Sequence, residues 1–105
     1  MKLTEPQALK GFSALSQETR LRIVRLLVTA GSSGLSAGAI AEQIGASSSR
    51  MSFHLSHLEH AGLLESRRDG RSIIYSVSFS ALNGLVEFLT HNCCKGSANA
   101  HPFVY

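Results

Sequence analysis

The stretch that decides the fold reads Gly45-Ala46-Ser47-Ser48-Ser49-Arg50-Met51-Ser52-Phe53-His54-Leu55-Ser56-His57-Leu58-Glu59-His60-Ala61-Gly62. Within it, Met51, Leu55, Leu58 and Gly62 are spaced by four, three and four residues, which places them on one face of a helix. A serine before the first turn, as at Ser47, is a preferred helix cap. Glycine at position 45 suits a sharp turn, because it tolerates left-handed backbone. The stretch therefore predicts a helix that opens at Ser47, directly after a tight turn, and ends at Gly62.

The other faces of this helix are polar and are expected to face solvent or a partner. They carry Ser48, Ser49, Arg50, Ser52 and Ser56. Phe53 has two interpretations: it contacts a partner, or it packs against the preceding helix.

A β-hairpin is predicted directly downstream. Residues 63–68 and 71–77 flank the pair Asp69-Gly70, and the second run is rich in residues that favour strands. Asp-Gly between two such runs is a strong hairpin signal, since both positions accept the positive φ of a tight turn. Three arginines surround the predicted tip, against one aspartate; they are Arg67, Arg68 and Arg71.

Apolar spacing predicts four more helices around this unit. The first spans Pro6 to Leu15, and Ser16 is expected to cap a second whose buried stripe includes Ile23 and Leu27. Residues 31–34 form a loop, and a short third helix spans residues 36–44. The last helix is capped by Ser78 or Ser80, and its apolar positions recur at Phe79, Leu82, Val86, Leu89 and Cys93.

The order of elements is four helices, a two-stranded hairpin and a last helix, so the fold class is mainly α with a small β-hairpin. Two short helices joined by a Gly-containing turn and followed by a hairpin are the layout of a winged helix-turn-helix. We expect one domain over residues 1–94 and a flexible tail over residues 95–105. So small a chain cannot bury the apolar stripes of both its first and last helices, which predicts a homodimer.

Composition narrows the class of protein. The chain has 105 residues, of which 44% are hydrophobic and 16% charged, with a formal net charge of +3. These values exclude a disordered charged protein. The amino end lacks the pattern of a secretory signal, and no apolar stretch reaches the roughly 20 residues of a membrane span. We expect a cytoplasmic protein with reduced thiols and no enzymatic activity, because no nucleophile–base set or phosphate loop is present.

The helix and the hairpin together favour double-stranded DNA as the partner. A helix fits the major groove, and side chains near its amino end reach base edges. Arg50 suits a two-pronged contact to guanine, and the serines suit bases or phosphates. The hairpin arginines suit phosphates or a narrow minor groove. A charged hairpin also deters strand-to-strand aggregation, so a merely solvated tip is the competing interpretation.

These residues resemble a known family. Residues 52–64, Ser-Phe-His-Leu-Ser-His-Leu-Glu-His-Ala-Gly-Leu-Leu, look like the S-x-H-L-x-x-L-x-x-A-G-L-V signature of the ArsR/SmtB repressors. Residues 14–23 are similar to the family's opening A-L-x-x-x-x-R-L-x-I-L segment, and Arg68-Asp69-Gly70-Arg71 with Tyr75 resembles its wing. The resemblance implies a dimeric winged-helix repressor that leaves operator DNA when a metal, metalloid or oxidant binds. By position it implies groove contacts by Ser48, Ser49, Arg50, Ser52 and Phe53.

The resemblance also bears on the inducer. The family's Cys-x-Cys site at the third helix is absent, because Ser36 and Gly38 occupy those positions. Glu87 and His91 are four apart, as for a zinc pair, but no second pair is evident, and His54 corresponds to the family's structural histidine. Asn92-Cys93-Cys94-Lys95-Gly96 is similar to an N-C-C-x-G arsenite motif of some members, without their later third cysteine.

Cys93 and Cys94 are therefore the predicted metalloid ligands, placed at the end of the last helix. Soft thiolates prefer soft, thiophilic centres, so the expected inducer is a trivalent arsenical (arsenite or methylarsenite) or antimonite. Lys95 is expected to favour the thiolate, while the carboxyl end of the helix opposes it. The plain alternative is that Cys93 packs as a small hydrophobic residue. Two functional alternatives stay open: a redox or persulfide sensor of the same fold, and a winged-helix protein–protein module.

Overall fold

Side-chain caps set where the helices begin. The computed structural model describes residues 2–96, and each of its five α-helices has a capping side chain that accepts a hydrogen bond from a first-turn amide. The helices are α1 (Glu5–Leu15), α2 (Glu18–Ala30), α3 (Ala37–Ile44), α4 (Ser48–His60) and α5 (Phe79–Thr90). The caps at Ser47 and Ser78 confirm two predictions. The predicted cap at Ser16 is wrong: Gln17 caps α2, while the Ser16 N–H closes α1 by donating to Phe12 and Ser13 carbonyls.

The sheet has one strand more than predicted. A short 3-10 helix, η1 (Gly31–Ser33), is followed by β1 (Leu35–Ser36), and the hairpin consists of β2 (Leu64–Asp69) and β3 (Ser72–Val77). The order is β1-β3-β2, antiparallel throughout. The predicted two-stranded hairpin is confirmed by β2 and β3. The additional strand β1 was not predicted, because a strand of two residues is too short to show an alternating pattern.

The hairpin turn is displaced by one residue from the predicted pair. Asp69 pairs with Ser72 as the last residue of β2, so the two turn residues are Gly70 and Arg71. Gly70 has a φ of 62° and Arg71 does not have a positive φ. A glycine with positive φ at the first turn position is the requirement of a type II′ turn, which suits the twist of a hairpin. The prediction that Asp69 takes positive φ is wrong.

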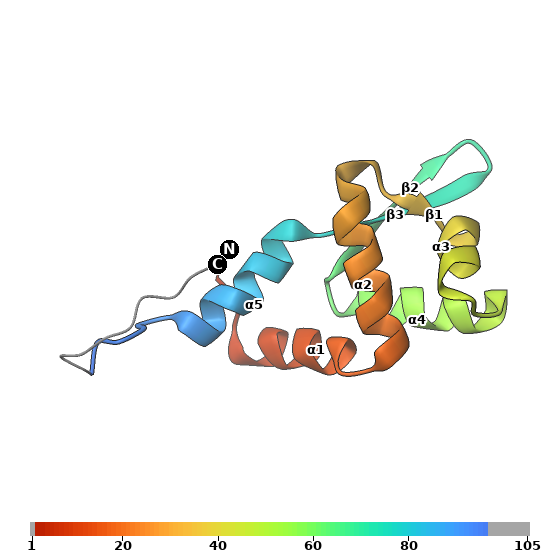
Figure 1. Cartoon of the computed structure of the whole chain (residues 1–105). Helices are drawn as coiled ribbons and strands as arrows, with labels where there is room; N and C mark the ends of the chain where they lie inside the picture. The colour runs from red at the N-terminus through yellow and green to blue at the C-terminus, as the bar shows by residue number, and fades with distance from the viewer. Residues whose placement is uncertain (1, 97–105) are drawn as a thin grey trace.

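The core lies where α2, α3, α4 and the sheet meet. Its largest fully buried side chains are Ile23, Leu27, Ile40, Met51, Leu55, Leu58 and Leu63. The predicted apolar face of α4 is confirmed by the burial of Met51, Leu55 and Leu58. Each such side chain contributes about 1.5–3 kcal/mol to folding relative to an exposed one. This core fixes α3 and α4 against the base of the hairpin (Figure 1).

Helices α1 and α5 pack together at the end of the molecule opposite the hairpin tip (Figure 1). The contact is close at Gly11, where a β-carbon would lie 3.0 Å from a methyl group of Leu85. The buried residues of α5 are Ala81, Gly84 and Leu85, whereas much of its apolar stripe is exposed. The exposed large apolar side chains of α1 and α5 are Leu9, Phe79, Val86, Phe88 and Leu89.

Helix α5 ends at Thr90, so Cys93 and Cys94 follow the helix rather than belonging to it. The predicted helical position of Cys93 is therefore wrong, and its side chain is exposed rather than packed. The predicted tail lies outside the described residues from position 97 onward. Among the described helices, none is both long and apolar enough to span a membrane.

Candidate nucleic-acid interface and cysteine turn

A tight turn between α3 and α4 sets the direction of α4. Gly45 ends α3 in the left-handed conformation, with φ 80° and ψ 28°, and its N–H donates to the Ala41 carbonyl over 2.8 Å. The Ser47 hydroxyl then accepts from the Arg50 amide over 3.3 Å. Only three residues join the two helices, which is the connection of a helix-turn-helix. The confirmed turn brings the first residues of α4 to the protein surface.

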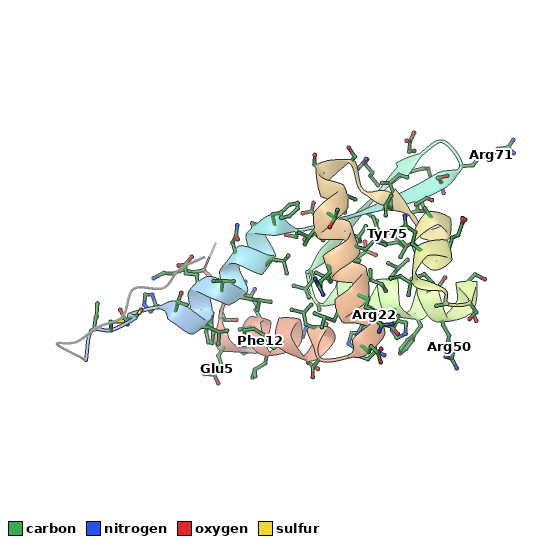
Figure 2. The ribbon with its side chains drawn as sticks, viewed as in Figure 1. Glu5, Phe12, Arg22, Arg50, Arg71 and Tyr75 are labelled. Carbon is green, nitrogen blue, oxygen red and sulfur yellow. The ribbon has the colours of Figure 1, made fainter. Side chains whose placement is uncertain are left out.

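The predicted contact residues of α4 are all exposed. Ser48, Ser49, Arg50, Ser52, Phe53 and Ser56 share this property. Figure 2 shows Arg50 pointing away from the body of the protein at the amino end of α4. Phe53 is 64% exposed, so packing against the preceding helix does not account for it. Its ring instead makes edge contacts with His54 and His57, at centroid distances of 5.5 and 6.2 Å.

Arg20 of α2 forms two hydrogen bonds, here called the clamp, that join α4 to the end of α1 on the side of α4 that faces the protein. The Arg20 Nε donates to the Ala14 carbonyl over 2.8 Å, and its Nη1 donates to His54 Nδ1 over 3.3 Å. Because arginine only donates, Nδ1 of His54 accepts and the ring is neutral. Burial, together with the charges of Arg20, His57 and Arg50, lowers the pKa of His54. The sequence showed His54 only through its resemblance to a structural histidine, and the structure supplies the partner on α2.

An open groove of about 570 Å³ brings the start of α2 to the same surface. Its lining includes Gln17, Thr19 and Arg22 from that segment, and Ser47, Arg50 and Phe53 from the turn and α4. Sequence reasoning missed the first three residues. Arg22 makes an exposed ion pair with Glu18 over 2.7 Å, and such a pair contributes little to stability. The groove thus adds polar and cationic groups beside α4.

The three arginines of the wing, which β2 and β3 form, differ in their hydrogen bonds. Arg68 and Arg71 are exposed, and Arg71 points outward from the hairpin tip in Figure 2. The Arg67 side chain instead donates to the carbonyls of Ser32 and Ser33, over 3.4 and 2.7 Å. The base of the wing is also tied to α4, because the Ser66 hydroxyl donates to Glu59 over 2.7 Å.

The two cysteines lie in an irregular turn after α5. The Cys93 N–H donates to the Thr90 carbonyl over 2.8 Å, and the Lys95 N–H donates to the Asn92 carbonyl over 3.3 Å. Asn92 and Cys94 have φ values of 59° and 69°, which non-glycine residues seldom adopt. Asparagine tolerates this region better than most residues, which gives Asn92 a structural reason to precede the cysteines.

The two sulfur atoms are in contact. The Cys93 and Cys94 Sγ atoms are 2.7 Å apart, and the two residues do not form a disulfide. The hydrogen bond with Cys94 raises the pKa of Cys93, and desolvation and the charge of Cys94 act in the same direction. The thiolate at Cys93 is thus disfavoured, opposite to the effect expected from Lys95. Within residues 2–96, no group of three His, Cys, Asp or Glu side chains is arranged to hold a metal ion, and Glu87 and His91 accordingly lack a third ligand there.

The fold and this surface define a winged helix-turn-helix protein, the class in which a helix and a hairpin wing bind DNA. A family model described as a helix-turn-helix domain matches residues 15–67. The chain is 36% identical to the HTH-type transcriptional regulator YgaV of Escherichia coli K12, over 84% of this chain and 87% of that protein.

Two solved structures extend the likeness. An ArsR-like transcriptional regulator from Rhodococcus sp. RHA1 is 31% identical, with a TM-score of 0.75 over 87% of this chain and 83% of that one. A possible transcriptional regulator for arsenical resistance is 33% identical, with a TM-score of 0.64 over 73% of this chain and 77% of that one. The chain belongs to the ArsR family of helix-turn-helix transcriptional regulators, and its role is to bind DNA.

Proposed function

We propose that the protein is an operator-binding repressor that a trivalent arsenical releases from DNA by binding Cys93 and Cys94. The contact between the two sulfur atoms, 2.7 Å apart, is the observation that carries the proposal. The similarity to a possible regulator for arsenical resistance supports the choice of ligand. Sulfur is the donor that such a soft, thiophilic centre prefers.

The binding step is an exchange of oxygen for sulfur on arsenic. Methylarsenite, CH3As(OH)2, reacts with two thiols, so that two As–S bonds form, two As–O bonds break and two water molecules leave. Each thiol proton departs with a hydroxide, so the step needs no oxidant. A raised pKa at Cys93 is compatible with this exchange, because the thiol proton is consumed in forming water.

Two protein sulfurs favour a ligand whose third position is already occupied. No third cysteine exists in the chain, and the described residues offer no three-ligand group. Methylarsenite carries its own methyl group on the third bond. Inorganic arsenite needs a hydroxide or a glutathione thiolate there, and antimonite has the same requirement. We therefore place methylarsenite first among the inducers.

DNA contacts are proposed for the exposed side chains of α4 and the wing. The side chains of α4 that would face the major groove are Ser48, Ser49, Arg50, Ser52, Phe53 and Ser56. Arg68 and Arg71 would reach phosphates or the minor groove from the wing, on the same side of the molecule as α3 and α4 (Figure 1). Arg67 belongs to this predicted set by position, although its guanidinium is already engaged with η1.

A homodimer is the proposed binding unit. Leu89 is 69% exposed and Leu9 60%, and they stand on two helices that pack against each other. Large apolar side chains exposed on neighbouring helices favour an interface, and closed two-fold pairs are the commonest assembly. Two copies of α4 would then read half-sites about one turn of DNA apart. Since α5 leads to the cysteine turn, ligand binding there would change the spacing of the two copies. Sedimentation equilibrium tests the dimer: Leu89→Asp is expected to give monomers, and a wild-type monomer contradicts it.

The inducer is tested by fluorescence anisotropy of a labelled duplex from the promoter of the protein's own gene. Methylarsenite, arsenite, antimonite, Zn²⁺, Cd²⁺ and peroxide are titrated against the complex. Methylarsenite is expected to weaken binding by roughly 5- to 150-fold, the usual range of allosteric coupling. The Cys93→Ser/Cys94→Ser double variant is expected to bind the duplex as before and to ignore the arsenical. Unchanged release from that variant would overturn the proposal.

The second candidate is a thiol redox sensor, which the contact between the two sulfurs also favours. Peroxide would oxidise both thiols to a disulfide with release of two water molecules. The raised pKa of Cys93 disfavours this route, because the thiolate is the species that oxidises. Mass spectrometry separates the two candidates: peroxide would remove two hydrogens, whereas methylarsenite would add one CH3As group in place of those hydrogens.

A further inference from the structure

We propose that Arg67 is a positioning residue that fixes the wing to η1, the segment directly after α2, so that Arg68 and Arg71 can reach DNA. The inference rests on the proposed DNA contacts of the wing and departs from the positional expectation that all three arginines contact DNA. Its basis is the pair of hydrogen bonds from Arg67 to the η1 carbonyls.

Arg67 reaches across the sheet to make these bonds. It lies on β2 and pairs with Ile74 of β3, which in turn pairs with Ser36 of β1. Its side chain therefore passes over the middle strand and ends at Ser32 and Ser33, in the segment that precedes β1. One guanidinium thus ties the outer strand of the wing to the connection between α2 and the sheet.

The carbonyls that Arg67 binds belong to Ser32 and Ser33 of η1, the 3-10 helix that directly follows α2. The last turns of helices carry carbonyl groups without an intrahelical partner and a partial negative charge. Neither α2 nor η1 has a basic residue in its last turn. Arg67 supplies from another strand the cation that this segment lacks, and hydrogen bonds from a charged donor are among the stronger ones.

The η1 segment is itself held in one position. Gly34 has φ 68° and ψ −170°, a region that is essentially restricted to glycine. A β-carbon on Gly34 would lie 2.4 Å from the Tyr75 carbonyl oxygen, so the chain passes directly against β3. The Ser32 and Ser33 carbonyls are therefore presented from a fixed support, which makes them a suitable anchor for the wing.

Arg68 and Arg71 are the residues that Arg67 is proposed to position for DNA contact. Successive side chains on a strand point to opposite faces, so Arg68 does not share the direction of Arg67. In the described part of the chain, neither Arg68 nor Arg71 makes a hydrogen bond or an ion pair. Their guanidinium groups remain available for phosphates, while that of Arg67 is occupied.

The test is a double-mutant cycle on DNA affinity, using anisotropy on the same duplex. Arg67→Met, Arg71→Met and the double variant are compared, and Arg68→Met is measured beside them as the second proposed wing contact. If Arg67 acts by positioning the wing, Arg71→Met is expected to reduce DNA affinity less in the Arg67→Met background than in the wild type. We expect a coupling of about 2- to 150-fold, the range shown by interacting residues. Additive losses would indicate an independent phosphate contact and overturn the inference.

Two further measurements separate positioning from contact. Amide hydrogen exchange without DNA is expected to be faster at Gly34 and in β1 for Arg67→Met, and unchanged for Arg68→Met. Arg67→Lys is expected to restore only part of the affinity, because an ammonium cannot reproduce the planar fork of two donors. Full restoration by lysine, or unchanged exchange in Arg67→Met, would overturn the inference.

Failure of the proposed wing contacts gives a different pattern from failure of the inference alone. If Arg68→Met and Arg71→Met leave DNA affinity unchanged, the wing contacts are wrong and the inference falls with them. If those variants lose affinity while Arg67→Met gives additive loss and normal exchange, the wing contacts stand and only the positioning role is wrong.

Discussion

His54 and Arg67, at the helix-turn-helix end, are each tied by a side-chain hydrogen bond to a different element, whereas the cysteine turn follows a helix that has already ended. In that turn, backbone hydrogen bonds of Cys93 and Lys95 hold two residues with positive φ. Such backbone costs roughly 1–2 kcal/mol per residue outside glycine. The surface proposed to face DNA is thus held by hydrogen bonds between separate elements, whereas the backbone hydrogen bonds of the cysteine turn join residues that are close in sequence.

The largest expected difference between the two regions comes from removing one positive charge from each, Arg50 on α4 or Lys95 beside the cysteines. Arg50→Met deletes the proposed guanine contact, and we expect operator affinity to fall by about 5- to 150-fold, or 1–3 kcal/mol. Lys95→Met removes the same charge beside the cysteines and is expected to leave affinity nearly unchanged, since distant charges are screened at physiological salt. Anisotropy titrations measure both variants. Equal losses would mean that net charge, not the position of Arg50, determines binding.

Glycine substitutions test whether the segment of η1 and Gly34 that anchors the wing is rigid, through their effect on the free energy of unfolding. Gly34→Ala is expected to lower the free energy of unfolding by about 1–3 kcal/mol, from the backbone region alone. The overlap with the Tyr75 carbonyl adds to that loss. Gly38→Ala, in the first turn of α3 with open space around it, is expected to raise stability by roughly 0.5–1 kcal/mol. Urea denaturation measures both, and a stable Gly34→Ala variant would contradict the rigid support.

The smallest expected effect is a pH dependence at the clamp behind α4. The pKa of His54 is lowered from 6.5 in the folded protein, mainly by burial and by Arg20. Between pH 6.5 and that lower value, the unfolded chain binds a proton that the folded protein does not. The free energy of unfolding should therefore fall as pH decreases below 6.5.

His54→Gln removes the titrating group while keeping an acceptor for Arg20. We expect its unfolding free energy to decrease less between pH 7 and pH 5 than that of the wild type. The exposed His60→Gln variant serves as the control and should keep the wild-type slope. Denaturation at several pH values provides the measurement, and equal slopes for His54→Gln and wild type would contradict the assignment.

Most of the local structure followed from short-range chemistry. Ser47, Gly45 and the spacing of Met51, Leu55 and Leu58 predicted the turn and α4 correctly, because capping, positive φ and helical periodicity depend on neighbours in sequence. The Asp-Gly pair likewise predicted a hairpin. Its exact turn residues were misplaced by one, since the pairing register of the two strands decides them.

Contacts between distant segments were beyond sequence reasoning. Arg67 was indistinguishable from Arg68 and Arg71 as one of three arginines near a hairpin tip. Its role depends on carbonyls some 34 residues earlier in the chain. Position 16 illustrates a subtler case: serine is the better general cap, but the geometry at the end of α1 used the Ser16 amide and left the capping role to Gln17.

The amino-acid sequence by itself determined the helices, the sharp turn and the presence of a hairpin, because those features arise from the preferences of adjacent residues. The tertiary structure decided which arginine anchors the wing and which arginines stay exposed. Those outcomes depend on packing and hydrogen bonding between segments, whose relative positions are fixed only when the whole chain folds.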